Sequence, residues 1–319
     1  MAEVITYSPA VTLVPTYECF NRCGYCNFRV APGQSPWLTL EQARHRLATI
    51  RRHSPQVTEI LLLSGEVHPH SPRRSEWVAH LQKLAQLVWD WGFWPHTNCG
   101  PLTEPEMRQL GRVNASMGLM LEQLRPDLPV HRHAPSKDPG LRLAQLEQAG
   151  RLGIPFTTGL LLGIGESPQD WERTLTAIAA CHRRWGHIQE VILQPHRPGT
   201  GQPDPFPEFD LNLLPTVVGL ARRILPAEIT LQIPPNLVQS PQILLDCLAA
   251  GARDLGGIGP KDEVNPDYPY PQVAALTTLL TAQGYTLQPR LPIYPKWLHS
   301  DWILPQFSSV SVPNCPKLV

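Results

Sequence analysis

The feature that most constrains the fold of this chain is a regular alternation of short apolar runs with amphipathic stretches. Residues 39–53 begin with the capping box Thr39-x-x-Gln42, which is typical of a helix start, and apolar residues recur every three or four positions in 75–91. Runs that are apolar on both faces and alternate with helices indicate a parallel sheet. We expect strands at 11–14, 59–64, 93–97, 117–121, 156–162, 188–194 and 229–233, and helices at 39–53, 75–91, from 103, and at 138–152, 168–185, 211–225, 241–250 and 273–283.

At least six such strand–helix units follow one another without a linker. This pattern predicts an α/β fold of the TIM-barrel type, complete or partial as in a (β/α)6 barrel, with its chemistry at the carboxyl ends of the strands. We expect one barrel domain over residues 1–284. Residues 285–319 are rich in Pro and aromatic side chains, and we expect them to form an irregular extension packed on the barrel.

Composition excludes several classes of protein. The chain has 319 residues, with 27 basic and 27 acidic side chains, and it has no uninterrupted apolar run of membrane-spanning length. Binding to nucleic acid through a broad basic surface is therefore not expected, nor is a membrane span. The amino terminus has no basic and apolar leader pattern, so we expect a cytoplasmic protein. Of seven cysteines, Cys99, Cys181, Cys247 and Cys315 are scattered and are expected to be ordinary free thiols.

The remaining three cysteines form the motif Cys19-x-x-x-Cys23-x-x-Cys26, directly after the first expected strand. Thiolates suit both zinc and iron–sulfur clusters. A structural zinc site normally has four protein ligands, and no second cysteine pair or nearby His is present, although a zinc loop remains the alternative. Three thiolates on a four-iron cluster leave one iron open, and the spacing resembles the signature of radical S-adenosylmethionine (SAM) enzymes. Tyr25 fits the aromatic residue common before the last cysteine.

Two further segments follow expected strands. Ser64-Gly65-Glu66 ends the second strand, where a carboxylate and exposed backbone can hold the amino group of SAM. The glycines of the run that includes Gly163 permit a close backbone approach, for which adenine is the expected partner. Glu166, in the same run, has the alternative role of placing a negative charge at the amino terminus of the helix that follows it.

Several segments together resemble a particular radical SAM family, the deazaflavin (FO) synthase subunit 1, or CofG, family. The resemblance extends over most of the chain, from about residue 11 to 310. Leu255 and Gly259 depart from this family, which more often has Trp and Ser there, and these two differences bear on contacts with the substrate. The segments that carry the resemblance are Cys19–Phe28, Ser64–Glu66, Leu255–Pro260, Asp262–Pro266, Tyr270-Pro271 and Arg290–Pro295.

The resemblance implies a [4Fe-4S] cluster, SAM as co-substrate, and formation of 7,8-didemethyl-8-hydroxy-5-deazariboflavin for coenzyme F420. The implied reaction is a lyase reaction: hydrogen abstraction from an adduct of tyrosine and 5-amino-6-ribitylaminouracil, then ring closure and release of ammonia. It also implies a second synthase subunit that makes the adduct, and an electron donor such as a flavodoxin or ferredoxin. No catalytic side chain is assigned, because the radical arises from SAM at the cluster.

Likeness to related barrels suggests roles for further residues. Glu122 would hold the SAM ribose and Arg142 the SAM carboxylate, through a bidentate fork. The alternative role for Glu122 is a capping residue at the surface, and the alternative role for Arg142 is a solvated charge on a helix. His68, His70 and His96 are expected to be solvated or capping residues. For the substrate, the candidates are polar residues near strand ends, each with a structural role as its alternative: Gln194, His196, Asp262 and Asn265.

Two rival hypotheses remain open. One is another radical SAM enzyme, such as the partner synthase subunit, a menaquinone-pathway enzyme or a biotin-synthase-like protein. The other is a zinc-stabilised binding protein without catalytic activity. Metal and sulfide analysis separates the second from the first, and product analysis separates the radical SAM enzymes from each other.

Overall fold

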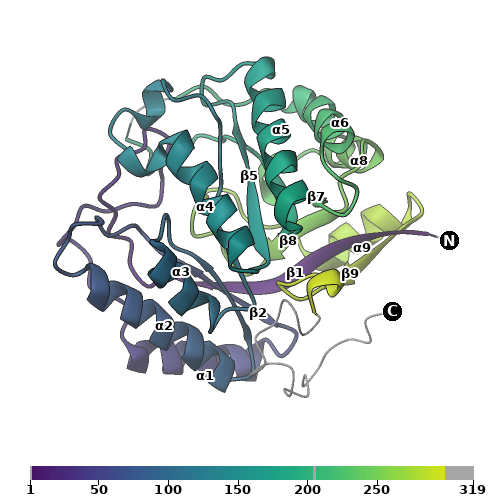
Figure 1. The fold of residues 1–319 in the computed structure, drawn as a ribbon. Helices are drawn as coiled ribbons and strands as arrows, with labels where there is room; N and C mark the ends of the chain where they lie inside the picture. The colour runs from purple at the N-terminus through teal and green to yellow at the C-terminus, as the bar shows by residue number, and fades with distance from the viewer. Residues whose placement is uncertain (1, 204–205, 299–319) are drawn as a thin grey trace.

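The computed structural model describes residues 2–203 and 206–298, and within them all nine strands belong to one parallel sheet. The strand order is β2-β3-β4-β5-β6-β7-β8-β1-β9, and β1 also pairs with β2, so the first eight strands close into a ring (Figure 1). The predicted α/β barrel is confirmed, and it has eight strands where the sequence indicated at least six units. The strands are β1 (Glu3–Leu13), β2 (Glu59–Leu63), β3 (Trp94–Asn98), β4 (Ser116–Gly118), β5 (Phe156–Leu162), β6 (Ile188–Pro195), β7 (Thr230–Gln232), β8 (Asp254–Ile258) and β9 (Tyr285–Pro289).

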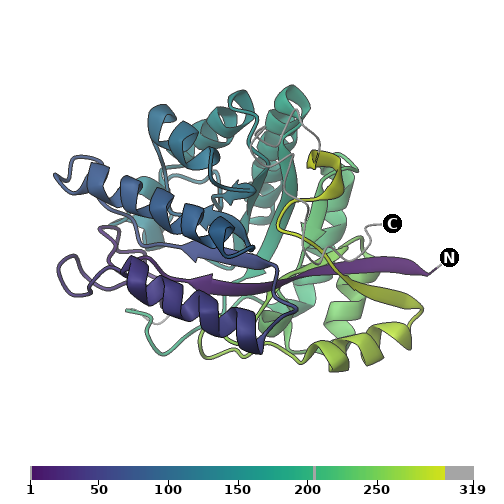
Figure 2. The same ribbon diagram turned by 90° about the horizontal axis from the view of Figure 1, so that it is seen from below.

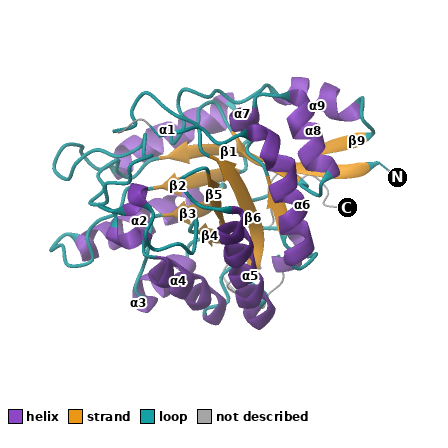
Figure 3. Ribbon diagram, turned by 90° about the horizontal axis from the view of Figure 1, so that it is seen from above, coloured by secondary structure: helices purple, strands orange, loops and turns teal. Residues whose placement is uncertain are grey.

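The helices surround the strands, as the view from above shows (Figure 3). Most begin at a capping residue that the sequence signals: Thr39 makes the expected capping box with Gln42, and Asp138 accepts a hydrogen bond from the Leu141 N–H. They are α1 (Leu40–His53), α2 (Arg74–Asp90), α3 (Glu104–Gly111), α4 (Pro139–Arg151), α5 (Pro168–Trp185), α6 (Leu214–Ile224), α7 (Pro235–Val238), α8 (Pro241–Ala249) and α9 (Val273–Thr281), with 3-10 turns at Pro129–His131, Pro135–Lys137, Leu211–Leu213 and Pro295–Trp297.

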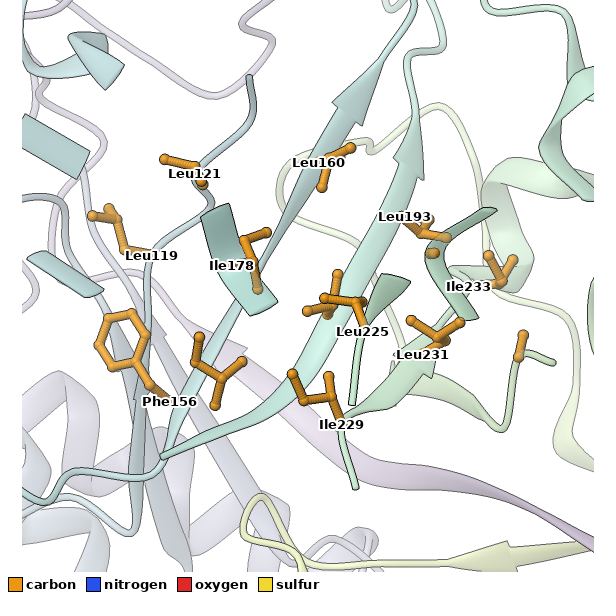
Figure 4. Packing of buried hydrophobic residues seen from close by; sticks show 14 of the residues in the cluster. Leu119, Leu121, Phe156, Leu160, Ile178, Leu193, Leu225, Ile229, Leu231 and Ile233 are labelled. Carbon is orange, nitrogen blue, oxygen red and sulfur yellow. The ribbon is translucent and has the colours of Figure 1, made fainter. Parts of the chain in front are cut away.

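The main core lies between the strands and the outer helices. Side chains on the outward face of β5 and β6, such as Phe156, Leu160 and Leu193, pack against Ile178 of α5 (Figure 4). Each of these four side chains is almost fully buried, at 2% exposure or less. Successive residues of a strand point to opposite faces, so the intervening residues Thr157, Gln194 and Glu190 point into the barrel.

Two strands near the end of the chain differ from the sequence prediction. The glycine-rich segment at 255–260 was not among the expected strands, but Asp254–Ile258 forms β8 and pairs with β1. The two glycines inside this strand, Gly256 and Gly257, hide the strand pattern, because glycine is rare in strand interiors. The expected irregular extension begins with a regular strand, since β9 pairs with β1 in parallel from Glu3 to Tyr7. Figure 2 shows β9 beside the amino-terminal part of β1.

Residues after β9 close the amino-terminal end of the barrel. Leu291, Ile293 and Trp297 pack with Trp94 and Ala115, which lie at the beginnings of β3 and β4. The Trp297 indole donates to the Gly186 carbonyl at 2.9 Å. The remainder of the predicted extension, and Cys315 with it, lies outside the described residues, and the division into two domains stays a prediction.

No helix in the two described ranges is long and apolar enough to cross a bilayer.

Candidate active site

The three-cysteine motif lies in the loop that follows β1, at the carboxyl ends of the strands. Backbone hydrogen bonds hold this loop on two sides: Phe20 N–H donates to the Glu66 carbonyl at 3.1 Å, and Gly24 N–H donates to the Val130 carbonyl at 2.8 Å. Within the loop, Cys26 N–H donates to the Cys23 carbonyl at 3.2 Å. The loop is therefore fixed to the segments after β2 and β4 rather than free at its centre.

The chemistry of these thiols fits an iron–sulfur cluster. Cys19, Cys23 and Cys26 are all free. Burial raises the pKa of Cys23 to about 12, and the nearby Cys26 and Cys19 add to the shift. A thiolate there needs a strong compensating positive charge, which iron supplies.

The alternative of a single-ion site fits less well. Among the described residues, no three His, Cys, Asp or Glu side chains converge on one ion. A four-iron cluster binds each cysteine through a different iron, so separated thiols are compatible with it.

Glu66 and Arg142 lie next to the cysteine loop and face each other. The Glu66 Oε2 atom accepts a hydrogen bond from Asn21 at 2.8 Å and another from the Ser136 hydroxyl. Arg142 Nη2 lies 3.5 Å from Glu66 Oε1, and both side chains are largely buried. A carboxylate beside a guanidinium complements the ammonium and carboxylate of an α-amino acid.

Gly65 fits against the start of the cysteine loop. A Cβ atom at this position would lie 2.1 Å from the Glu18 carbonyl oxygen, and Gly65 N–H already donates to the Thr16 carbonyl at 2.8 Å. Only glycine permits this approach without displacing the backbone. The segment thus keeps Glu66 close to Cys19.

Glu122 is buried and is held by three donors. The Tyr25 hydroxyl donates to Oε2 at 2.6 Å, His131 Nε2 lies 2.9 Å from the same atom, and the Lys137 ammonium contacts Oε1. Burial alone would raise the pKa of Glu122, but Lys137 and His131, with Arg142 nearby, hold it well below the usual range. The sequence alternative of a surface cap is wrong, because the side chain is only 4% exposed. The alternative for Arg142, a solvated helix charge, is wrong for the same reason, at 2% exposure.

The glycine turn after β5 is closed by its own glutamate. Glu166 accepts hydrogen bonds from the N–H groups of Gly163 and Ile164, both at 2.7 Å, and from the Trp171 indole at 2.9 Å. Gly163 has a φ of +89°, in the left-handed region that favours glycine. Its N–H is therefore occupied, and any contact from this turn to adenine would use other atoms.

The interior of the barrel contains a cavity of about 190 Å³. Inward-facing residues from all eight strands of the ring line it, together with residues from the loop after β8 and from the segment after β9. Leu255 and Gly259, the two departures from the family pattern, are among them. The cavity is polar at both ends, which suits a ligand with several hydrogen-bonding groups.

Three of the four predicted substrate residues line this cavity: Gln194, Asp262 and Asn265. Asp262 accepts from Asn236 at 2.9 Å and from the Val264 N–H at 2.8 Å, so it also shapes its own loop. His196 is not among the lining residues. Its Nδ1 atom lies 3.0 Å from the Pro207 carbonyl and its ring packs edge-on to Phe206.

Several residues of the site could not be found from the sequence. His131 and Lys137 lie between β4 and α4 without any periodic pattern, and only folding brings them to Glu122. Asn21 is the exception among these residues, because its position inside the cysteine motif is a signal that the sequence does contain. His96 was expected to be solvated or capping, which is wrong: it is 8% exposed and lines the cavity. His68 and His70 are exposed, as expected.

The chain is similar to known proteins along most of its length. A model of the radical SAM superfamily matches residues 13–178. A 7,8-didemethyl-8-hydroxy-5-deazariboflavin synthase of Thermosynechococcus vestitus is 64% identical over 95% of this chain and 96% of its own length. The chain belongs to this radical SAM family. Synthases of the same name from Synechococcus elongatus and Trichodesmium erythraeum are 63% and 56% identical, over 92% and 95% of this chain and 88% and 94% of their own lengths.

Solved structures share the fold of this chain at low sequence identity. The FeFe-hydrogenase maturase HydG of Carboxydothermus hydrogenoformans superposes with a TM-score of 0.73 at 18% identity, over 90% of this chain and 68% of its own. Methylornithine synthase (PylB) superposes with a TM-score of 0.66 at 16% identity, over 90% of this chain and 84% of its own. The cofactors of this superfamily are a [4Fe-4S] cluster and SAM, and the free thiols after β1 fit the cluster.

Proposed function

We propose that this protein is a 7,8-didemethyl-8-hydroxy-5-deazariboflavin synthase, a radical SAM lyase that closes a tyrosine–ribitylaminouracil adduct into the deazaflavin ring and releases ammonia. The observation that carries this proposal is the extent of the similarity to the synthases. The similar region, 64% identical over 95% of the chain, includes the cavity walls as well as the cysteine loop. A superfamily signature alone would cover only the loop and the first half of the barrel.

Cys19, Cys23 and Cys26 would hold the cluster, which leaves one iron without a protein ligand. When bound, the cluster and SAM together supply the radical that removes a hydrogen atom from the substrate. We propose that Glu66 binds the amino group of SAM and Arg142 its carboxylate, because the two side chains already form a facing pair of opposite charges.

Glu122, with its ionised carboxylate, would accept hydrogen bonds from the ribose hydroxyls of SAM, and the Tyr25 ring lies beside it. Gly163 would border the adenine. In this arrangement the residues bind and orient SAM between the cysteine loop and the barrel interior.

The substrate would occupy the cavity, with Gln194, Asp262 and Asn265 as its polar contacts near the mouth. His196 would support this wall from behind. We also propose that a second synthase subunit supplies the adduct, and that a small redox protein such as a flavodoxin or ferredoxin supplies the electron.

The test is an anaerobic assay of the reconstituted protein with SAM, reductant and the tyrosine–ribitylaminouracil adduct. The proposal expects about four iron and four sulfide per chain, formation of 5′-deoxyadenosine, and deazaflavin fluorescence. Formation of 5′-deoxyadenosine without deazaflavin would favour another radical SAM enzyme. One zinc with no sulfide would favour a binding protein. Cys23→Ala should abolish the cluster, whereas the matched control Cys247→Ala, at a buried thiol of α8, should retain it.

A further inference from the structure

The inner end of the barrel cavity carries a group of buried charges. Arg290 lies between Asp254 and Glu190: its Nε is 2.6 Å from Asp254 Oδ2 and its Nη2 is 2.7 Å from Glu190 Oε1. The Tyr294 hydroxyl donates to Glu190 at 2.8 Å. These side chains satisfy one another, so they form a rigid polar floor rather than an open binding group.

Glu59, at the first position of β2, differs from them because half of its carboxylate is unused. Its Oε2 atom accepts a hydrogen bond from the Ser8 hydroxyl, while Oε1 receives none from the described residues. The side chain is buried, at 7% exposure, yet it lines the cavity. Oε1 is not one of the enclosed polar atoms that lack a partner, so it is open to the cavity, and water or a ligand there can donate to it.

His96, on the neighbouring strand β3, presents a second unused acceptor. Its Nδ1 lies 2.7 Å from the Ser116 hydroxyl, and that hydroxyl donates its single proton to the Pro292 carbonyl at 2.7 Å. The Nδ1 atom must therefore carry the hydrogen of the ring, which leaves a lone pair on Nε2. Burial lowers the pKa of His96 to about 3, and the Arg290 guanidinium adds to the shift, so the ring stays neutral.

The space in front of the imidazole is kept open by a glycine. A Cβ atom on Gly118 would lie 2.8 Å from His96 Nε2. His96, like Glu59, is more than nine-tenths buried and lines the same cavity. Two acceptors without donors thus face one enclosed space.

We propose that the inner end of the cavity is a recognition site for a polyol chain, and that Glu59 and His96 accept hydrogen bonds from its hydroxyl groups. This inference rests on the proposed function, in which the polyol is the ribityl chain of the substrate and product. The cysteine loop lies at the opposite, carboxyl-terminal end of the strands. The reacting rings must stay near that loop, so the unreactive ribityl chain is the part that reaches the floor.

Tyr270 also lines this cavity. Burial, with Asp262 and Glu59 nearby, raises the pKa of Tyr270, so its hydroxyl keeps its proton. A polyol hydroxyl both donates and accepts hydrogen bonds. The cavity lining offers it both kinds of partner, with Tyr270 as a donor and Glu59 and His96 as acceptors. The cavity of about 190 Å³ has room at this end for the five-carbon chain of the substrate.

The experiment compares binding of two ligands to the reconstituted holoprotein by fluorescence titration. One ligand is 7,8-didemethyl-8-hydroxy-5-deazariboflavin, and the other is the same ring with a methyl group in place of the ribityl chain. Wild-type protein should bind the ribityl compound at least about tenfold more tightly. Glu59→Gln keeps the acceptor for Ser8 and removes the charge, and it should reduce this preference about five- to tenfold.

Gly118→Ala is a second variant, which covers His96 Nε2 without changing any charge, and it should also reduce the preference. Glu41→Gln, on the exposed face of α1, is the matched control and should leave it unchanged. Equal binding of both ligands by wild-type protein that makes deazaflavin would overturn the polyol site and leave the proposed function intact. An unchanged preference in both folded variants would also overturn it. Failure to bind either ligand, together with no deazaflavin from the adduct, would instead remove the proposed function and the inference with it.

Discussion

Replacing Arg290 with methionine should destabilise the protein strongly. The guanidinium is 7% exposed and pairs with Asp254 and Glu190, which are 0% and 6% exposed. Met fills most of the volume, so the main effect is to leave the buried Asp254 carboxylate without its cation. Glu190 contributes less, because burial raises its pKa to about 8 even beside Arg290, so that it is largely protonated at pH 7. Breaking a buried ion pair from one side costs about 3–5 kcal/mol, because the orphaned charge stays desolvated. Urea unfolding at pH 7, followed by circular dichroism, measures this loss.

Two controls separate the charge effect from a general loss of packing. Arg108→Met removes an exposed ion pair with Glu104, whose side chains are 56% and 47% exposed, and should cost less than about 1 kcal/mol. Asp254→Asn in the Arg290→Met background removes one orphaned charge and should restore at least about 1 kcal/mol. A loss below about 1 kcal/mol in Arg290→Met, or no recovery in the double variant, would refute the electrostatic reasoning.

The pH dependence of the same variant provides an independent check. Without Arg290, burial raises the pKa of the remaining carboxylates in the folded state above their unfolded values. The folded state then binds more protons than the unfolded chain, so the penalty grows as pH rises. The difference in stability between Arg290→Met and wild type should therefore shrink as pH is lowered from 8 to 5. A constant difference across this range would contradict the assignment.

Three further predictions concern single positions. Gly65→Ala should cost about 1–3 kcal/mol, because its Cβ would lie 2.1 Å from the Glu18 carbonyl oxygen. Gly219→Ala, within helix α6 and free of close contacts, should instead stabilise the protein by about 0.5–1 kcal/mol, and thermal melting compares the two variants. Thr39→Ala removes the capping box of α1 and should cost about 1 kcal/mol in urea unfolding, and an unchanged midpoint would count against the cap. Burial lowers the pKa of His96 to about 3, so NMR should show a neutral ring from pH 9 to 5. The unfolded chain protonates this histidine below about pH 6.5, so the contribution of His96 to stability is lost progressively as pH falls below that value.

Local sequence signals were sufficient for most of the helices and for the order of the barrel. The caps at Thr39 and Asp138 involve residues only three positions apart, and the structure has both of them. The cysteine motif is similarly local, because its three thiols lie on one short loop. The free thiols Cys99, Cys181 and Cys247 are buried, as expected for ordinary core cysteines.

By itself, the sequence determined the α/β barrel, the cysteine loop at its mouth and the family, because periodicity, capping and motif spacing depend on neighbours along the chain. Only the tertiary structure decided which polar residues share an environment. Arg290 meets Asp254 and Glu190 across 36 and 100 residues of chain. His96 acquires its tautomer from Ser116 and from a carbonyl that lies 176 residues beyond that serine. Such contacts depend on closure of the strand ring and on how the residues after β9 pack against the amino-terminal end of the barrel. No local sequence pattern encodes the distances between these side chains.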